Sequence, residues 1–261
     1  MNELPHARIS AAIEAANQAR RVGLVPFITA GYPQKDRFID TLDALSAVAE
    51  VIEIGVPFSD PMADGVTIQR SSHAAIEAGV SLHWIIDQLT AARRAGKTFA
   101  PLILMSYLNP LFIYGFRQLA QDAADAGVCG FIVPDLPLEE GAEFRDALAH
   151  AGLGQVQLIT PTTTDERMAE LCQASKGFVY AVTVTGITGG GTVIPPEVTG
   201  YLDRVSAVAE IPVCAGFGIR EAAQVESIGR HADGVIVGSA LVEHLEAGHD
   251  PAAFLQGLRP A

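Results

Sequence analysis

Eight short, nearly continuous apolar segments recur along the 261-residue chain and constrain its fold more than any other feature. Segments of this kind are typical of buried β-strands, and stretches of helical period, such as residues 35–49, lie between them. This alternation favours parallel strands joined by helices, and about 250 residues is typical of a closed (β/α)8 barrel. The predicted strands are residues 24–29, 51–55, 101–106, 130–135, 155–160, 177–183, 212–216 and 234–238.

The alternation runs without a linker or low-complexity segment. We therefore predict one domain over residues 1–261, a single TIM barrel with an extra N-terminal helix. The first 21 residues have helical spacing and no apolar core of signal-peptide length. No segment approaches the roughly 18 apolar residues of a membrane span. We expect a soluble, cytoplasmic protein.

Charge and cysteine content exclude several functions. Lys and Arg total 17 against 30 Asp and Glu, so the net charge is -13, and nucleic acids and anionic membranes are poor candidates as partners. Cys129, Cys172 and Cys214 are scattered without the CxxC spacing of a zinc site, and they do not form a disulfide framework. We predict no metal site and buried free thiols.

Glycines end the last two predicted strands, each followed by a helical segment. Gly216 and Gly218 lie in the motif CAGFGIR, and Gly238 and Ser239 lie in VIVGSAL. Glycine lets the backbone approach an anion, and the N–H groups at a helix start point toward it. Because the loops after strands 7 and 8 are the frequent phosphate site of this fold, we predict a phosphorylated substrate. The alternative is that the glycines only make tight turns between strand and helix.

The segment VIEIGVPFSDPMADG, residues 51–65, places Glu53 within a predicted buried strand. Side-chain alternation puts Glu53 inside the barrel near its catalytic end, where desolvation would raise its pKa and suit it to proton transfer. The alternative is a structural ion pair with a basic residue across the barrel. Asp60 and Asp64 follow in a turn-rich loop, and Asp64 could equally cap a helix that starts near Val66.

Six motifs in order over nearly the whole chain resemble those of the tryptophan synthase alpha subunit. They are VIEIGVPFSDPMADGVTIQRS, LMSYLNPLF, VPDLP, YAVTVTGITGG, CAGFGI and VGSAL. The resemblance implies a barrel that cleaves indole-3-glycerol phosphate by a retro-aldol reaction to indole and glyceraldehyde 3-phosphate. It also implies no cofactor in this chain and a partner beta subunit, in an alpha2-beta2 complex, that carries pyridoxal phosphate and receives the indole.

The resemblance also assigns residues. The family's catalytic carboxylates match Glu53, which would carry protons, and Asp64, which would stabilise the charged indole ring beside its N–H group. The remaining matches are Tyr180 as an active-site tyrosine, Phe27, Leu104 and Phe217 at the indole end, Gly189, Gly218, Gly238 and Ser239 at the phosphate, Thr188 in the lid, and Asp60, Asn109 and Pro137 at the partner interface. Without the resemblance, Tyr180 and the three indole-end residues would be read as ordinary core packing. The chain departs from the family pattern in the glycine- and proline-rich GGGTVIPPEV and at Val184, where some members have a basic residue.

Three functions remain open at this point. The first is the alpha subunit of a two-component synthase. The second is a stand-alone lyase of the same chemistry, or another phosphate-binding barrel such as an aldolase or epimerase. The third is a non-catalytic barrel that acts as an allosteric binding module, and the presence of Glu53, Asp64 and Tyr180 argues against it.

Overall fold

The computed structural model, which describes residues 4–183, 194–216 and 218–259, contains a closed barrel of eight parallel strands. Each strand pairs with its neighbour in the chain, and the last pairs with the first. The strands are β1 (Gly23–Thr29), β2 (Ile52–Gly55), β3 (Leu102–Met105), β4 (Val128–Ile132), β5 (Gly154–Ile159), β6 (Val179–Val182), β7 (Val213–Gly216) and β8 (Gly234–Val237). All eight predicted strands and the predicted TIM barrel are confirmed.

The fourth strand differs most from its predicted bounds, because it spans Val128–Ile132 rather than residues 130–135. Gly127 ends the preceding helix in the left-handed conformation, with φ +90°, which frees the chain to become extended at Val128. At the other end, Pro134 has no N–H group to donate to a neighbouring strand. The strand is therefore shifted toward the N-terminus.

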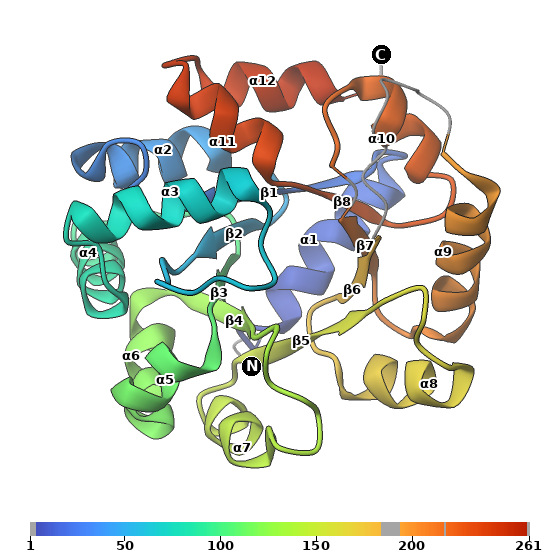
Figure 1. Ribbon diagram of the computed structural model, residues 1–261, viewed down its shortest axis with the longest axis horizontal. Helices are drawn as coiled ribbons and strands as arrows, with labels where there is room; N and C mark the ends of the chain where they lie inside the picture. Colours follow the sequence, from blue (N-terminus) through green and yellow to red (C-terminus); the bar gives the residue numbers. More distant parts are fainter. Residues whose placement is uncertain (1–3, 184–193, 217, 260–261) are drawn as a thin grey trace.

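Helices other than α1 (Ala7–Gln18) surround the barrel on its outside (Figure 1). Helix α1 precedes β1, as predicted. The others are α2 (Phe38–Ser46), preceded by the 3-10 helix η1 (Lys35–Arg37), then α3 (Val66–Glu77), α4 (Leu82–Arg94), α5 (Leu108–Tyr114), α6 (Phe116–Ala126), α7 (Ala142–His150), α8 (Asp165–Ala174), α9 (Pro196–Val208), α10 (Ala222–Ile228), α11 (Ser239–Glu246) and α12 (Pro251–Leu258). In the described part of the chain, none of these helices has the length and apolar character to cross a membrane.

Side chains of the strands alternate between two buried clusters. One cluster fills the layer between barrel and helices and includes Ile52 and Ile54 of β2. The other fills the barrel interior and includes Val51, Ile103 of β3 and Phe178. The interior positions determine which strand side chains reach the site, because among the residues of a strand they alone point toward the barrel axis.

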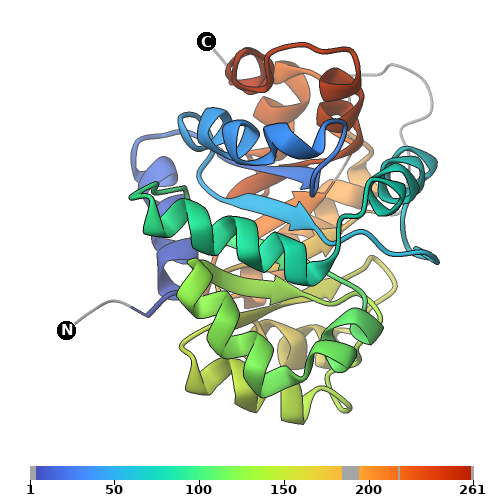
Figure 2. The ribbon, with the colours of Figure 1, turned by 90° about the vertical axis from the view of Figure 1, so that its left-hand side faces the viewer.

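Helix α1 closes the N-terminal end of the barrel. Ile9 and Ile13 are fully buried within the interior cluster. A Cβ on Gly177 would meet Ile9 at 3.0 Å, so that glycine lets the helix approach closely. Figure 2 shows α1 at the left, with the strand arrows pointing away from it. The loops that follow the strands therefore emerge at the opposite, open end.

Candidate active site

A cavity of about 180 Å³ lies at the carboxyl ends of the strands. It brings together side chains from loops and strands that are far apart in the sequence. Its lining residues are Phe27, Glu53, Asp64, Ile68, Met105, Tyr180, Gly216, Gly218, Ile236, Gly238 and Ser239. Seven of the predicted site residues, Phe27, Glu53, Asp64, Tyr180, Gly218, Gly238 and Ser239, thus meet in one place.

Glu53 projects into this cavity from β2 and is 1% exposed. Within the described residues, no ion pair reaches its carboxylate, and its Oε2 atom is buried without a hydrogen-bond partner. Burial, followed by the charge of the nearby Asp64 carboxylate, raises the pKa of Glu53 to about 8. The side chain therefore carries a proton near neutral pH, and the structural ion pair is not supported.

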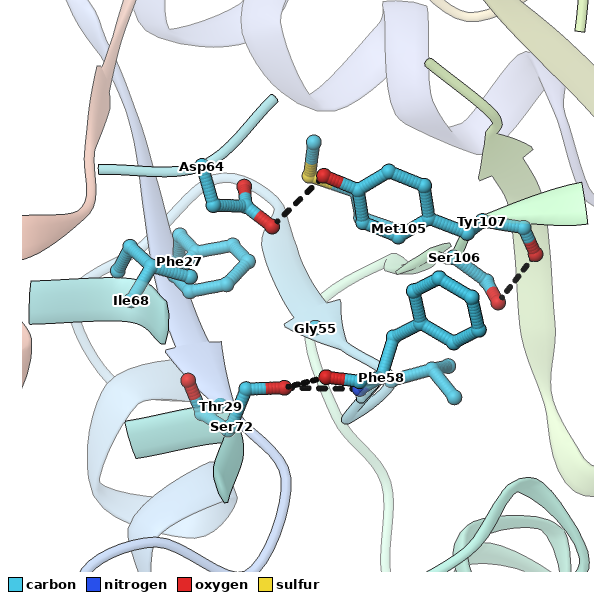
Figure 3. Close-up of a pocket in the computed structure, with 11 residues that line it drawn as sticks. Phe27, Thr29, Gly55, Phe58, Asp64, Ile68, Ser72, Met105, Ser106 and Tyr107 are labelled. Carbon is cyan, nitrogen blue, oxygen red and sulfur yellow. Dashed lines mark hydrogen bonds between the residues drawn. The ribbon is translucent and has the colours of Figure 1, made fainter. Parts of the chain in front are cut away.

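Asp64 lies in the loop between β2 and α3. The Tyr107 hydroxyl donates a hydrogen bond to its Oδ2 atom (3.1 Å) (Figure 3). The same hydroxyl accepts a hydrogen bond from the backbone N–H of Ala63 (2.8 Å). Helix α3 is capped by Gly65 rather than by an Asp64 side chain, which leaves the carboxylate free to face the cavity. Burial raises the pKa of Asp64, and the hydrogen bond from Tyr107 opposes this increase.

Tyr180 projects into the barrel from β6, beside Gly216 of β7. A Cβ on Gly216 would lie 2.7 Å from the Tyr180 ring, so the glycine makes room for the tyrosine. Burial, followed by the charges of Glu53 and Asp64, raises the pKa of Tyr180 well above its ordinary value. The phenol is therefore neutral across the physiological range and is available as a hydrogen-bond donor.

The apolar end of the cavity differs from the sequence prediction at one residue. Leu104 is fully buried among the side chains that face the outer helices, while its neighbour Met105 lines the cavity. The prediction for Leu104 is wrong because Leu104 pairs with the outward-facing Ile54, and Met105 pairs with Gly55 on the inward-facing row. Phe27 lies as predicted, over Gly55, where a Cβ would come within 2.4 Å of its ring.

Sequence reasoning missed Met105, Tyr107 and Ile68. A small second cavity, lined in part by these three residues, adjoins the first, and the Tyr107 ring stacks on Phe58 with centroids 4.9 Å apart (Figure 3). Strict alternation from the end of the third strand would have indicated Met105. The position of Tyr107, beyond the end of the strand, gives no such signal.

The opposite end of the cavity is formed by Gly218, Gly238 and Ser239. Gly218 has φ +64°, a conformation that favours glycine, and no atom lies within 4 Å of where its Cβ would be. Gly238 caps α11, and no side chain caps that helix start. The backbone N–H groups at this end are therefore placed to bind an anion.

The other predicted residues lie outside the cavity or outside the described chain. Asp60 and Pro137 are exposed on the loops after β2 and β4, and Asn109 is exposed in α5, which follows β3, at the open end of the barrel. Thr188, Gly189 and Phe217, together with Val184, lie outside the described residues. Across the described ranges, no three His, Cys, Asp or Glu side chains are grouped to hold a metal ion.

Comparison with known proteins identifies the family. Residues 13–257 match the family model of the tryptophan synthase alpha chain. The chain belongs to the tryptophan synthase alpha chain family. It is 48% identical to the tryptophan synthase alpha chain of Nitratidesulfovibrio vulgaris strain Hildenborough, over 95% of this chain and 96% of that one. The corresponding protein of Solidesulfovibrio magneticus is 46% identical, over 93% and 94%. A solved structure of tryptophan synthase from Mycobacterium tuberculosis superposes with a TM-score of 0.87 at 36% identity, covering 96% of both chains.

The buried Glu53 carboxyl makes the stability of this alpha chain depend on pH. Its pKa of about 8 lies above the ordinary value of 4.5, so between these values the folded protein keeps a proton that the unfolded chain has lost. We expect the free energy of unfolding to fall by roughly 3–5 kcal/mol between pH 4 and pH 9, relative to Glu53→Gln. Urea unfolding of both proteins over this range measures the difference. Parallel curves would contradict the burial of an unpaired carboxyl.

Because Met105 and Leu104 face opposite sides of β3, we expect substitution of the first to lower activity and substitution of the second to lower stability. Met105→Ala removes apolar contact from the cavity, so we expect kcat/KM to fall by roughly tenfold or more, with little change in stability. Leu104→Ala leaves a void in the outer layer, so we expect the free energy of unfolding to fall by about 2–5 kcal/mol with KM nearly unchanged. Steady-state assays and urea unfolding measure both. A larger rise in KM for Leu104→Ala would restore Leu104 to the site.

Proposed function

We propose that Glu53 and Asp64 are the catalytic carboxylates with which this alpha chain cleaves indole-3-glycerol phosphate to indole and glyceraldehyde 3-phosphate. The observation that carries the proposal is a fully buried, protonated carboxyl that shares a cavity with a second carboxylate and with glycines at a helix start. Cleavage of this carbon–carbon bond requires a proton donor, a base and a stabiliser of positive charge on the ring. The cavity has a group for each role.

Glu53 acts on both sides of the breaking bond. Its carboxylic acid donates a proton to C3 of the indole ring, which leaves a positively charged ring. The resulting Glu53 carboxylate takes the proton of the glycerol C3' hydroxyl. The carbon–carbon bond then breaks, its electron pair neutralises the ring, and the hydroxyl carbon becomes the aldehyde of glyceraldehyde 3-phosphate. Glu53 ends protonated, as it began.

Asp64 and Tyr180 support this step. Asp64, held by Tyr107, accepts a hydrogen bond from the indole N–H and stabilises the positive charge that forms on the ring. Tyr180 stays neutral beside Glu53 and keeps that region of the cavity closed to water. Phe27 and Met105 hold the ring itself in apolar contact.

The phosphate group occupies the end of the cavity formed by Gly218, Gly238 and Ser239. Backbone N–H groups and the start of α11 bind it without a cluster of basic side chains. From the resemblance alone, we add Gly189 to the phosphate contacts, Phe217 to the indole end and Thr188 as the residue that bonds Asp64 when the lid closes.

Replacing Glu53 by Gln keeps the shape of the side chain and removes its proton. We expect kcat for cleavage to fall at least about 10²-fold while binding of glycerol 3-phosphate is unchanged, because the phosphate contacts remain. Indole release and calorimetry measure the two quantities. Asp60→Asn, which removes a carboxylate from an exposed part of the neighbouring loop, is the control and should retain basal cleavage. Near-normal turnover of Glu53→Gln would remove Glu53 from the mechanism.

We further propose that the open end of the barrel binds a beta subunit in an alpha2-beta2 complex in the cytoplasm. The beta subunit would carry pyridoxal phosphate and receive the indole, whereas this chain would use no cofactor. Large apolar side chains support a protein partner there: Met62 is 88% exposed, and Val66, Phe112 and Ile113 are also exposed. Asp60 and Pro137, on loops, and Asn109, in α5, lie at the same end and complete the proposed surface.

Phe112 tests this surface and separates a synthase subunit from a stand-alone lyase. We expect Phe112→Asp to weaken binding of the cognate beta subunit by roughly tenfold or more, because it places a charge in an apolar contact. Cleavage by the isolated chain should persist. Val208→Asp, on an exposed apolar residue of α9, is the matched control. Indole release with and without the beta subunit measures the effect. No stimulation of the wild type would favour the stand-alone lyase.

A further inference from the structure

Helices α3 and α11, which begin at opposite ends of the cavity, are joined by side chains that lie outside the cavity. Thr67 of α3 donates a hydrogen bond to Oε1 of Glu243 on α11 (3.2 Å). Arg70, one helical turn further along α3, pairs with Glu246 of α11 (2.6 Å). Tyr32, from the loop after β1, also donates to Glu246. The Glu246 contacts fix the helices side by side, whereas Glu243 lies closer to the start of α11.

Glu243 has a second partner, which comes from the loop after β7. Arg220 approaches Oε2 of Glu243 through Nη1 (2.8 Å) and Oε1 through Nη2 (3.2 Å). Arg220 follows Gly218 by two residues, and its backbone N–H is held by Gln224 of α10 (2.8 Å). The Oε1 atom of Glu243 is therefore shared between Arg220 and Thr67.

The two helices that Glu243 and Thr67 join each begin at one of the two proposed ligand sites. Helix α11 begins at Ser239, one turn before Glu243, and Ser239 lines the proposed phosphate site with Gly218. Helix α3 begins two residues after Asp64, and Gln69 of this helix donates to the Asp64 carbonyl oxygen (2.9 Å). A shift of the first turn of α3 therefore moves Asp64.

We propose that Glu243 is a positioning residue that links occupancy of the phosphate site to the position of Asp64, an inference that rests on the assignment of both sites above. A phosphate dianion near Gly218 and Ser239 attracts the Arg220 guanidinium. Oε1 of Glu243 is then left to Thr67, which fixes the first turn of α3 and Asp64 with it. A ligand in the phosphate site thus favours the arrangement that binds the indole N–H, and the coupling is reciprocal.

Calorimetry with one product, indole, and an analogue of the other, glycerol 3-phosphate, tests this link. Glycerol 3-phosphate is the probe for the phosphate site, and indole is the probe for the apolar end. In the wild type, we expect saturating glycerol 3-phosphate to tighten indole binding by about fivefold or more, the lower end of usual coupling between sites. In Glu243→Ala, we expect less than about twofold tightening, with each ligand alone binding within about twofold of the wild type. A purely structural role would instead weaken both ligands alone.

Two further variants complete the experiment. Thr67→Val replaces only the hydroxyl, by a methyl group of similar size. We therefore expect the coupling to be lost although the ion pair between Arg220 and Glu243 remains. Glu226→Ala breaks a comparable exposed pair, Glu226 with Arg230 (2.9 Å), and should retain the coupling. Coupling that is absent from the wild type, that persists in Glu243→Ala or that is lost in Glu226→Ala would overturn the proposal. If glycerol 3-phosphate does not bind the wild type at all, the proposed phosphate site is wrong, and this inference is wrong with it.

Discussion

The burial of one carboxyl group without a basic partner is the constraint on which the site depends. Glu53 lies among apolar side chains of the barrel interior, where an ionised form is strongly disfavoured, so its pKa rises to about 8. The closed barrel holds this carboxyl in place, although burying it without a partner lowers the stability of the folded protein. The second carboxylate, Asp64, lies on a loop and accepts a hydrogen bond from Tyr107. The two acids therefore differ in environment, as their different roles require.

The fold could be predicted from the sequence because its periodicity is local. Runs of apolar residues defined each strand, and alternation placed Glu53 on the inward face correctly. On the third strand the resemblance indicates Leu104, whereas the same alternation indicates its neighbour Met105, which faces the cavity. The contact between Tyr107 and Asp64 joins residues 43 positions apart through a loop whose path the sequence pattern does not specify. The sequence pattern thus predicts which face of a strand a side chain occupies, but it does not predict the geometry of the loops.

The glycines of the site act in two different ways. Gly55 and Gly216 lie on strands, where the missing Cβ makes room for the rings of Phe27 and Tyr180. Gly218 instead adopts a positive φ in a loop, and Gly238 starts a helix. The motif CAGFGIR by itself predicts a close approach to an anion at both Gly216 and Gly218, although only Gly218 has an open space beside it. A shared motif therefore contains one packing glycine and one glycine suited to binding.

The closure of the barrel by α1 determines the side from which ligands reach and leave the cavity. Ile9 and Ile13 fill the interior at that end, so among the described residues the cavity is reached from the other end, where the loops after the strands lie. Substrate and both products therefore enter and leave on the same side of the barrel. The exposed side chains of Met62 and Phe112 belong to segments that follow β2 and β3, on this same side of the barrel. The barrel is therefore closed at one end, and the order in which ligands bind and leave depends on the loops at the other end.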